Sequence, residues 1–152
     1  MSRTFAVNGI DDVSRRIIEQ LQEDGRRSYG AIAKVVGLSE AGVRQRVQKL
    51  IESGVMQIVA VTDPMKVGRF RQAMVGLKVQ GPVEPVADAL SAMPEVVYVV
   101  TCAGSFDLLC EVVCEDDEHL AELISERIRS NPNINSTETF VYLRLSKDAY
   151  RW

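Results

Sequence analysis

The stretch after Ser39 carries arginine and glutamine side chains at a spacing that suits a binding surface. In a helix, Arg44, Gln45 and Gln48 lie away from an apolar face that includes Val43. An arginine can form two hydrogen bonds to guanine, and a glutamine can do the same to adenine. These residue types at this spacing indicate a surface able to read the edges of base pairs.

Basic residues are concentrated around the same stretch. Between residues 26 and 49 there are six lysines and arginines but one acid, Glu40. Residues 1–70 have a net charge of +3 and residues 71–152 a net charge of −6, which gives the chain its overall −3. A basic region in an acidic protein indicates that one end meets a polyanion. A solvated face on two surface helices would give the same pattern.

Three short helices are expected to position these side chains. An acid at position 11 or 12 can cap the first helix, which Gly25 ends, and Ser28 can cap a second. Gly37 supplies the turn before Ser39, the N-cap of a third helix. Two helices joined by a tight turn that contains glycine are typical of the helix-turn-helix. The β-branched run over residues 55–62 is expected to form a strand.

The hydrophobic pattern changes in the second half, where strands and helices follow the order β-α-β-β-α-β. This order predicts a ferredoxin-like domain of the α+β class, with a four-stranded antiparallel sheet and two helices on one face. Two short helices cannot cover both apolar faces of the strands, so the other face is expected to be buried against a second subunit. The expected strands are Ala73–Val79, Val96–Cys102, Leu108–Cys114 and Thr137–Leu145, and the expected helices begin at Pro85 and at Asp116 or Asp117.

Four stretches of the chain resemble the Lrp/AsnC (leucine-responsive, or feast/famine) family of transcription regulators. They are IDDVSRRIIEQLQEDGRRSYGAIAKVVGLS, LSEAGVRQRVQKLIESGVMQ, DPMKVG and AGSFDLLCEV. The resemblance implies a winged helix-turn-helix domain over residues 1–61, a linker over residues 62–72 and a ferredoxin-like effector-sensing and oligomerisation domain over residues 73–152. It also implies a cytoplasmic homodimer, or a ring of dimers, that binds double-stranded DNA and an amino-acid effector.

The expected DNA-binding residues are exposed positions of the third helix, the serines at helix starts and nearby basic residues. A helix N-terminus and its cap favour a phosphate, whereas Arg46 and Lys49 could either contact phosphates or form internal ion pairs. The set comprises Ser28, Ser39, Glu40, Ala41, Arg44, Gln45, Arg46, Gln48 and Lys49.

The resemblance also implies an effector pocket at the turn Gly104-Ser105-Phe106-Asp107, because a G-x-x-D stretch helps to form that pocket in the family. Glycine permits close backbone approach, and Asp107 could pair with the ammonium of an amino acid. Thr137 and Thr139 match family positions that offer hydroxyls to the ligand. The alternative is a hairpin turn in which Asp107 caps the backbone.

No motif in the sequence indicates an enzyme, a metal site or a cofactor. The three cysteines (Cys102, Cys110 and Cys114) form no C-x-x-C pair, and with a lone His119 they fit buried, reduced thiols better than a zinc site. Neither a signal peptide nor a membrane span is expected. We find no Ser/His/Asp set, Walker loop or G-x-G-x-x-G.

The sequence therefore leaves three functional hypotheses. The favoured one is a sequence-specific transcriptional regulator whose DNA binding or assembly responds to an amino acid. The first alternative is an architectural protein that coats DNA with low specificity. The second is an enzyme similar to the sirohaem decarboxylases, whose architecture resembles this family; a single histidine and an acidic C-terminal half argue against tetrapyrrole chemistry.

Overall fold

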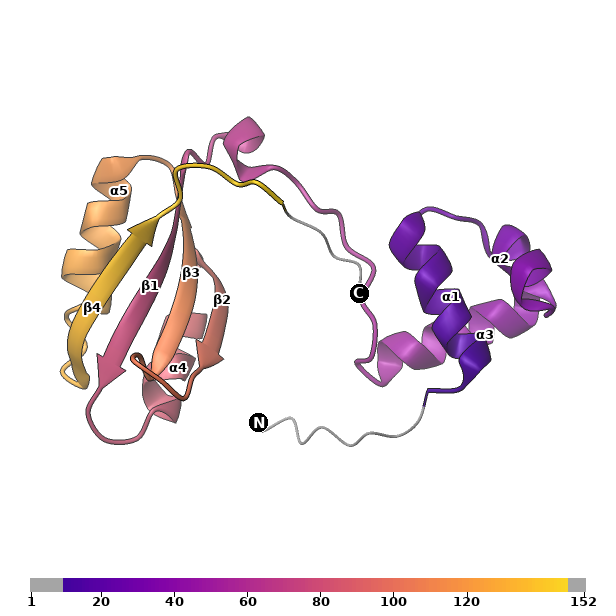
Figure 1. Ribbon diagram of the computed structural model, residues 1–152, viewed down its shortest axis with the longest axis horizontal. Helices are drawn as coiled ribbons and strands as arrows, with labels where there is room; N and C mark the ends of the chain where they lie inside the picture. The colour runs from indigo at the N-terminus through magenta and orange to yellow at the C-terminus, as the bar shows by residue number, and fades with distance from the viewer. Residues whose placement is uncertain (1–9, 148–152) are drawn as a thin grey trace. The chain divides into compact units, whose positions relative to one another are not determined.

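The computed structural model describes residues 10–147 (Figure 1). The chain divides into two compact units, with the boundary between Val61 and Thr62. The outer ends of the expected domains, residues 1–9 and 148–152, lie outside the described residues.

Among the described residues, the N-terminal unit contains three helices, each with a side-chain cap at its start. They are α1 (Asp12–Glu23), α2 (Tyr29–Val36) and α3 (Glu40–Glu52). Asp11 accepts the backbone N–H of Ser14 at 2.8 Å, and Ser39 accepts that of Gly42 at 3.1 Å. Ser28 caps α2 in the same way. The predicted caps are confirmed, and each satisfies a backbone donor that a helix start leaves free.

A small apolar core holds the three helices together. Ile17, Ile32 and Val43 are fully buried in it, one from each helix. Gly37 ends α2 at φ 75°, in the left-handed region that favours glycine, and so allows the tight turn before α3. Burial of each such aliphatic side chain contributes about 1.5–3 kcal/mol. The predicted helix-turn-helix is therefore a packed unit.

The strand expected over residues 55–62 does not form, and that prediction is wrong. Residues 55–62 form no helix or strand, and the side chains of Val59 and Val61 are 69% and 60% exposed. A strand requires a neighbour to pair its N–H and C=O groups, and β-branched composition alone cannot provide one. The helix-turn-helix consequently has no wing strand in this segment. A short 3₁₀ helix, Pro64–Val67, follows.

The C-terminal unit is an antiparallel sheet in the order β2-β3-β1-β4, as Figure 1 shows. This confirms the ferredoxin-like α+β architecture. The strands are β1 (Arg71–Val79), β2 (Val96–Thr101), β3 (Leu108–Cys114) and β4 (Ile134–Val141), and the helices are α4 (Glu84–Ser91) and α5 (Asp117–Glu122), which continues as a π-helical turn over Leu123–Ile128.

The last strand differs from the prediction at both ends. Ile134 pairs with Val79 and Ser136 with Lys78, so pairing with β1 extends the strand before Thr137. Regular pairing stops at Val141, opposite Ala73. Cross-strand partners therefore determine the bounds of β4 more than its own composition does.

One face of the sheet packs against both helices. Val75, Leu77, Leu108 and Val112 are fully buried there, together with Leu90 from α4. The cysteines of β3, Cys110 and Cys114, are also fully buried on this face, as predicted for small apolar side chains. Burial raises the pKa of the Cys110 thiol to about 11, so the group is a protonated packing element near neutral pH.

The opposite face of the sheet is covered by no helix in the described unit. A cross-strand row on it runs through Tyr98, Glu111, Met74 and Phe140. Tyr98 and Phe140 are 51% and 44% exposed. The sheet thus has one buried face and one open face, which combines exposed aromatic side chains with polar ones such as Glu111.

Candidate functional sites

The exposed side of α3 contains most of the expected DNA-binding residues. Val43, Val47 and Leu50 are buried in the helical core, which turns most of the remaining positions of the helix to solvent. Their exposure follows from the helical period, because the buried residues occupy one stripe. The expected residues that are exposed are Ser28, Ser39, Glu40, Ala41, Arg44, Gln45, Gln48 and Lys49.

Two of these exposed side chains already have an acidic partner within α3. Arg44 Nη2 lies 3.0 Å from Glu40 Oε1, one helical turn earlier. Gln48 donates to Glu52 Oε1 at 2.9 Å, one turn later. Because the pairs are solvent-exposed, each is weak enough to exchange for a stronger ligand.

Arg46 differs from the other expected residues because it faces α1. Its Nη1 lies 2.6 Å from Asp11 Oδ2 and 3.1 Å from Ser14 Oγ. The hydrogen bond from Arg46 and those from Ser14 lower the pKa of Asp11 to about 2. Of the two roles considered for Arg46, the internal ion pair is the one formed in the free chain.

A further contact involves a residue that the sequence analysis did not single out. The Arg44 guanidinium carbon lies 5.4 Å from the centroid of the Tyr29 ring, which belongs to the first turn of α2. Tyr29 is itself partly buried against the helical core. No local spacing signals this pair, since it depends on how α2 and α3 pack.

The turn Gly104–Asp107 connects β2 to β3 and is tied to the end of β1. The Asp107 backbone N–H donates to the Leu77 carbonyl at 2.9 Å. The Asp107 carboxylate accepts the backbone N–H of Val79 through Oδ2 at 2.8 Å. Asp107 therefore caps a backbone N–H, as the hairpin-turn interpretation expected, but that N–H belongs to β1 and not to the turn itself.

The expected effector residues are divided between the two faces of the sheet. Phe106 covers Gly76 on the open face, where its ring forms an edge-to-face pair with Phe140 at 6.2 Å between centroids. Thr137 and Thr139 pair with Leu77 and Val75, whose side chains lie in the core on the helix-covered face. Alternation along a strand thus separates the threonines from the Phe106 ring.

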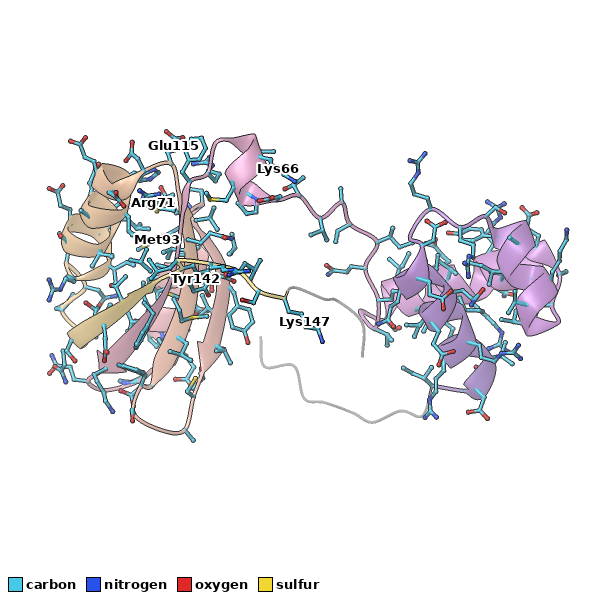
Figure 2. The ribbon with its side chains drawn as sticks, turned by 45° about the horizontal axis from the view of Figure 1, so that its top comes forward. Lys66, Arg71, Met93, Glu115, Tyr142 and Lys147 are labelled. Carbon is cyan, nitrogen blue, oxygen red and sulfur yellow. The ribbon has the colours of Figure 1, made fainter. Side chains whose placement is uncertain are left out.

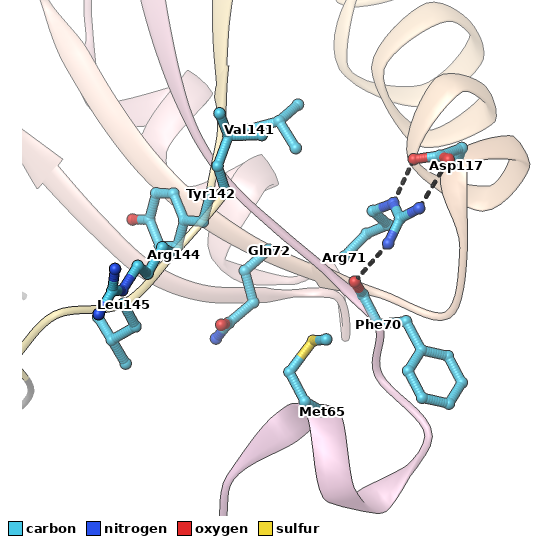
Figure 3. Close-up of a pocket in the computed structure, with 10 residues that line it drawn as sticks. Met65, Phe70, Arg71, Gln72, Asp117, Val141, Tyr142, Arg144 and Leu145 are labelled. Carbon is cyan, nitrogen blue, oxygen red and sulfur yellow. Dashed lines mark hydrogen bonds and ion pairs between the residues drawn. The ribbon is translucent and has the colours of Figure 1, made fainter.

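A pocket of about 520 Å³ lies at the other end of β1, and the sequence analysis missed it (Figure 3). Arg71 bridges both carboxylate oxygens of Asp117 on one side, with Arg71 Nη2 2.9 Å from Asp117 Oδ2. Met65, Phe70 and Tyr142 line other parts. Figure 2 shows that Arg71 and Glu115 lie at the end of the sheet where α5 begins. None of the expected effector residues lines this pocket.

A second missed feature is an ion-pair cluster where β2 meets α5. Glu95 Oε1 lies 2.6 Å from Arg127 Nη1 and 3.3 Å from His119 Nε2. Burial opposes ionisation of Glu95, but the hydrogen bonds from Arg127, from the backbone N–H of Glu95 and from His119 together outweigh it and lower the pKa of this carboxyl. The cluster fastens the start of β2 to the helix layer.

Residues 10–147 contain neither a cluster of metal-ligating side chains nor a membrane-spanning helix. No group of three histidine, cysteine, aspartate or glutamate side chains in this range could hold a metal ion. No helix in the same range is long and apolar enough to cross a membrane.

Comparison with known proteins identifies both units. Residues 10–51 match the AsnC-type helix-turn-helix domain, and residues 70–152 match a C-terminal dimeric alpha+beta barrel domain of the AsnC type. An uncharacterised HTH-type transcriptional regulator of Pyrococcus furiosus is 32% identical over 143 residues, which cover 93% of this chain and 97% of that protein.

Solved structures agree over nearly the whole chain. An AsnC family regulator from Agrobacterium tumefaciens superposes with a TM-score of 0.81 at 27% identity and covers 94% of this chain and 96% of its own. The transcriptional regulator NMB0573 of Neisseria meningitidis, solved as an L-Met complex, has the same fold with a TM-score of 0.83 at 21% identity, covering 93% and 95% of the two chains. As the four stretches of the sequence indicated, the chain belongs to the Lrp/AsnC family of helix-turn-helix transcriptional regulators.

Proposed function

We propose that this regulator reads a specific DNA site with α3 and that an amino acid modulates its binding or assembly. The exposed row on α3 carries the proposal: Arg44, Gln45 and Gln48 project from a helix whose opposite stripe is buried. Bidentate pairing of arginine and glutamine with purines would then supply base specificity. The capped helix start at Ser39 suits a phosphate.

Dimerisation would bring two such helices to one operator. The match to a dimeric domain over residues 70–152 supports a homodimer, and so does the open face of the sheet with Tyr98 and Phe140 exposed. A two-fold dimer favours a pseudo-palindromic operator with half-sites spaced by about one helical turn of DNA. Rings of dimers and action in the cytoplasm belong to the same proposal.

The effector is proposed to be an amino acid that contacts the Gly104–Asp107 turn. The Neisseria relative of this fold was solved with L-Met, which supports an amino acid as the ligand class. Asp107 uses Oδ2 to accept from Val79, and a carboxylate has further lone pairs with which to meet an ammonium. Thr137 and Thr139 would act only on a ligand that reaches the helix-covered side of β4.

Selection of duplexes from a randomised DNA pool by the purified full-length protein tests the reading function. A specific regulator should enrich a pseudo-palindromic sequence and bind it about a thousandfold or more tighter than unrelated DNA. Enrichment of no sequence, with uniform binding to all duplexes, would support the architectural alternative. A parallel thermal-shift screen of the twenty amino acids tests the effector, since a ligand that binds only the native state raises the melting temperature.

A further inference from the structure

The side chain of Arg44 is held from two directions in the free chain. On α3 its guanidinium pairs with Glu40 at 3.0 Å, and from α2 the Tyr29 ring lies 5.4 Å away, measured to the ring centroid. The side chains of Arg44 and Glu40 are nevertheless 66% and 57% exposed. The reading side chain is therefore accessible to a ligand while its orientation is already restricted.

The first turn of α2 also meets the carboxylate partner of Arg44. A Cβ atom placed on Gly30 would lie 3.1 Å from Glu40 Oε2, so the carboxylate rests close against the α2 backbone. Tyr29 and Gly30 thus form a platform under the Glu40–Arg44 pair. Ile32 of α2 and Val43 of α3 are fully buried in one core, which fixes the platform relative to the reading helix.

We propose that Tyr29 is a positioning residue for DNA reading: its ring holds Arg44 in an orientation that suits a base edge. This inference rests on the proposed function of α3. A free arginine side chain loses much rotamer freedom when it forms a bidentate contact. Because the ring face attracts the guanidinium, part of the entropy cost of ordering Arg44 is already met in the free protein. Tyr29 therefore acts on specific DNA through Arg44.

The test uses the full-length chain and the duplex that the wild-type protein selects from a randomised pool, compared with an unrelated duplex of equal length. Tyr29→Leu should weaken binding to the selected duplex by about two- to fivefold, the range expected for an exposed cation–π contact. Binding to the unrelated duplex should not change. Tyr29→Met should behave as Tyr29→Leu does, because methionine fills space flexibly without a ring.

Tyr29→Phe is the matched control, because it keeps the ring and removes only the hydroxyl. It should retain wild-type affinity and specificity. In an Arg44→Ala background, Tyr29→Leu should have no additional effect, since the residue it positions is gone. Melting temperatures of all variants separate loss of binding from loss of folding.

Several outcomes would overturn the inference. A loss with Tyr29→Phe would mean that the hydroxyl itself contacts DNA. If Tyr29→Leu still weakens binding in the Arg44→Ala background, Tyr29 is a structural residue. The same conclusion follows if both non-aromatic variants lose affinity in step with their melting temperatures. If Arg44→Ala weakens binding and the Tyr29 variants do not, this inference alone fails. If Arg44→Ala has no effect, or no duplex is selected, the proposed function fails with it.

Discussion

The exposed side of α3 and the open face of the C-terminal sheet present different chemistry to a partner. The α3 surface is polar and holds its side chains in weak, solvent-exposed pairs such as Arg44–Glu40. The sheet face displays the large side chains Tyr98 and Phe140, with Glu111 in the row between them. Exposed ion pairs exchange readily for another charged ligand, whereas exposed apolar surface is stabilised by burial. The first surface thus suits DNA, and the second suits another copy of the chain.

The largest effect is expected where a second negative charge is placed on the open face, opposite Glu111. Tyr98→Asp should abolish the dimer, because it would bury a second carboxylate opposite Glu111 in each subunit, and a buried, unpaired carboxylate costs about 3–5 kcal/mol. Sedimentation at micromolar concentration measures the change. The control is Thr101→Asp, which adds the same charge to β2 at an exposed position. Thr101 pairs with Leu108 and so lies on the other face of the sheet from Tyr98, and this variant should remain dimeric. An intact dimer in Tyr98→Asp would mean that this face is not the subunit interface.

Close packing at the sheet end should make Gly76 intolerant of any side chain. A Cβ at Gly76 would approach the Phe106 ring to 2.8 Å. Gly76→Ala should therefore lower the free energy of unfolding by about 1–3 kcal/mol, the usual range for overpacking. Denaturant titration measures this, and the second substitution Phe106→Leu should restore part of the loss. Equal loss in the single and double variants would argue against the ring as the cause.

Gly30 in the N-terminal unit should tolerate the substitution that Gly76 does not. Gly30 faces the mobile end of the Glu40 side chain, which can move by the few tenths of an ångström that a methyl group needs. Alanine is the better helix former by about 1 kcal/mol. Gly30→Ala should thus not destabilise the chain in the same titration, and a loss as large as that of Gly76→Ala would show that the carboxylate is fixed.

The effector turn is tested by separating the charge of Asp107 from its hydrogen bond to β1. Asp107→Asn keeps an oxygen that can accept from Val79, but it removes the charge that an ammonium would need. The variant should retain its melting temperature and lose the shift produced by the best amino acid, with a coupling change of about 1–3 kcal/mol. A full ligand response in this variant would locate the ammonium elsewhere.

The smallest effect concerns acid stability of the helical unit. The folded pKa of Asp11 is about 2, below its ordinary value of 3.8, so its pairing with Arg46 stabilises the fold above about pH 4. That contribution should disappear as the pH falls from 4 towards 2. Asp11→Asn should flatten the pH dependence of unfolding in this window, and an unchanged pH profile would contradict the assignment.

The two units also differ in how far local sequence patterns predicted them. The cap at Ser39 and the spacing of Val43 and Val47 are local signals, and they predicted α3 and its exposed side. The strand expected over residues 55–62 failed because a strand depends on a partner that composition does not reveal. In the second unit, the order of strands and helices along the chain was predictable, but the bounds of β4 follow its register with β1.

Side-chain roles were predictable only where one element determines them. The contact of Tyr29 with Arg44 joins two helices, and the cover of Phe106 over Gly76 joins a turn to a strand. Neither pair has a characteristic spacing in the chain. Asp107 was singled out for its charge, yet its observed hydrogen bond serves the backbone of β1.

Base-pair scanning of the selected operator with wild type and Arg44→Ala tests the central claim most directly. Arg44→Ala should weaken specific binding by about 1–3 kcal/mol and make the protein indifferent to the base at one position of each half-site. The control Lys49→Ala should weaken binding to all duplexes about equally and reduce the salt slope by about one unit. Unchanged operator affinity in Arg44→Ala at moderate salt, with every position still discriminated, would show that α3 is not the reading helix.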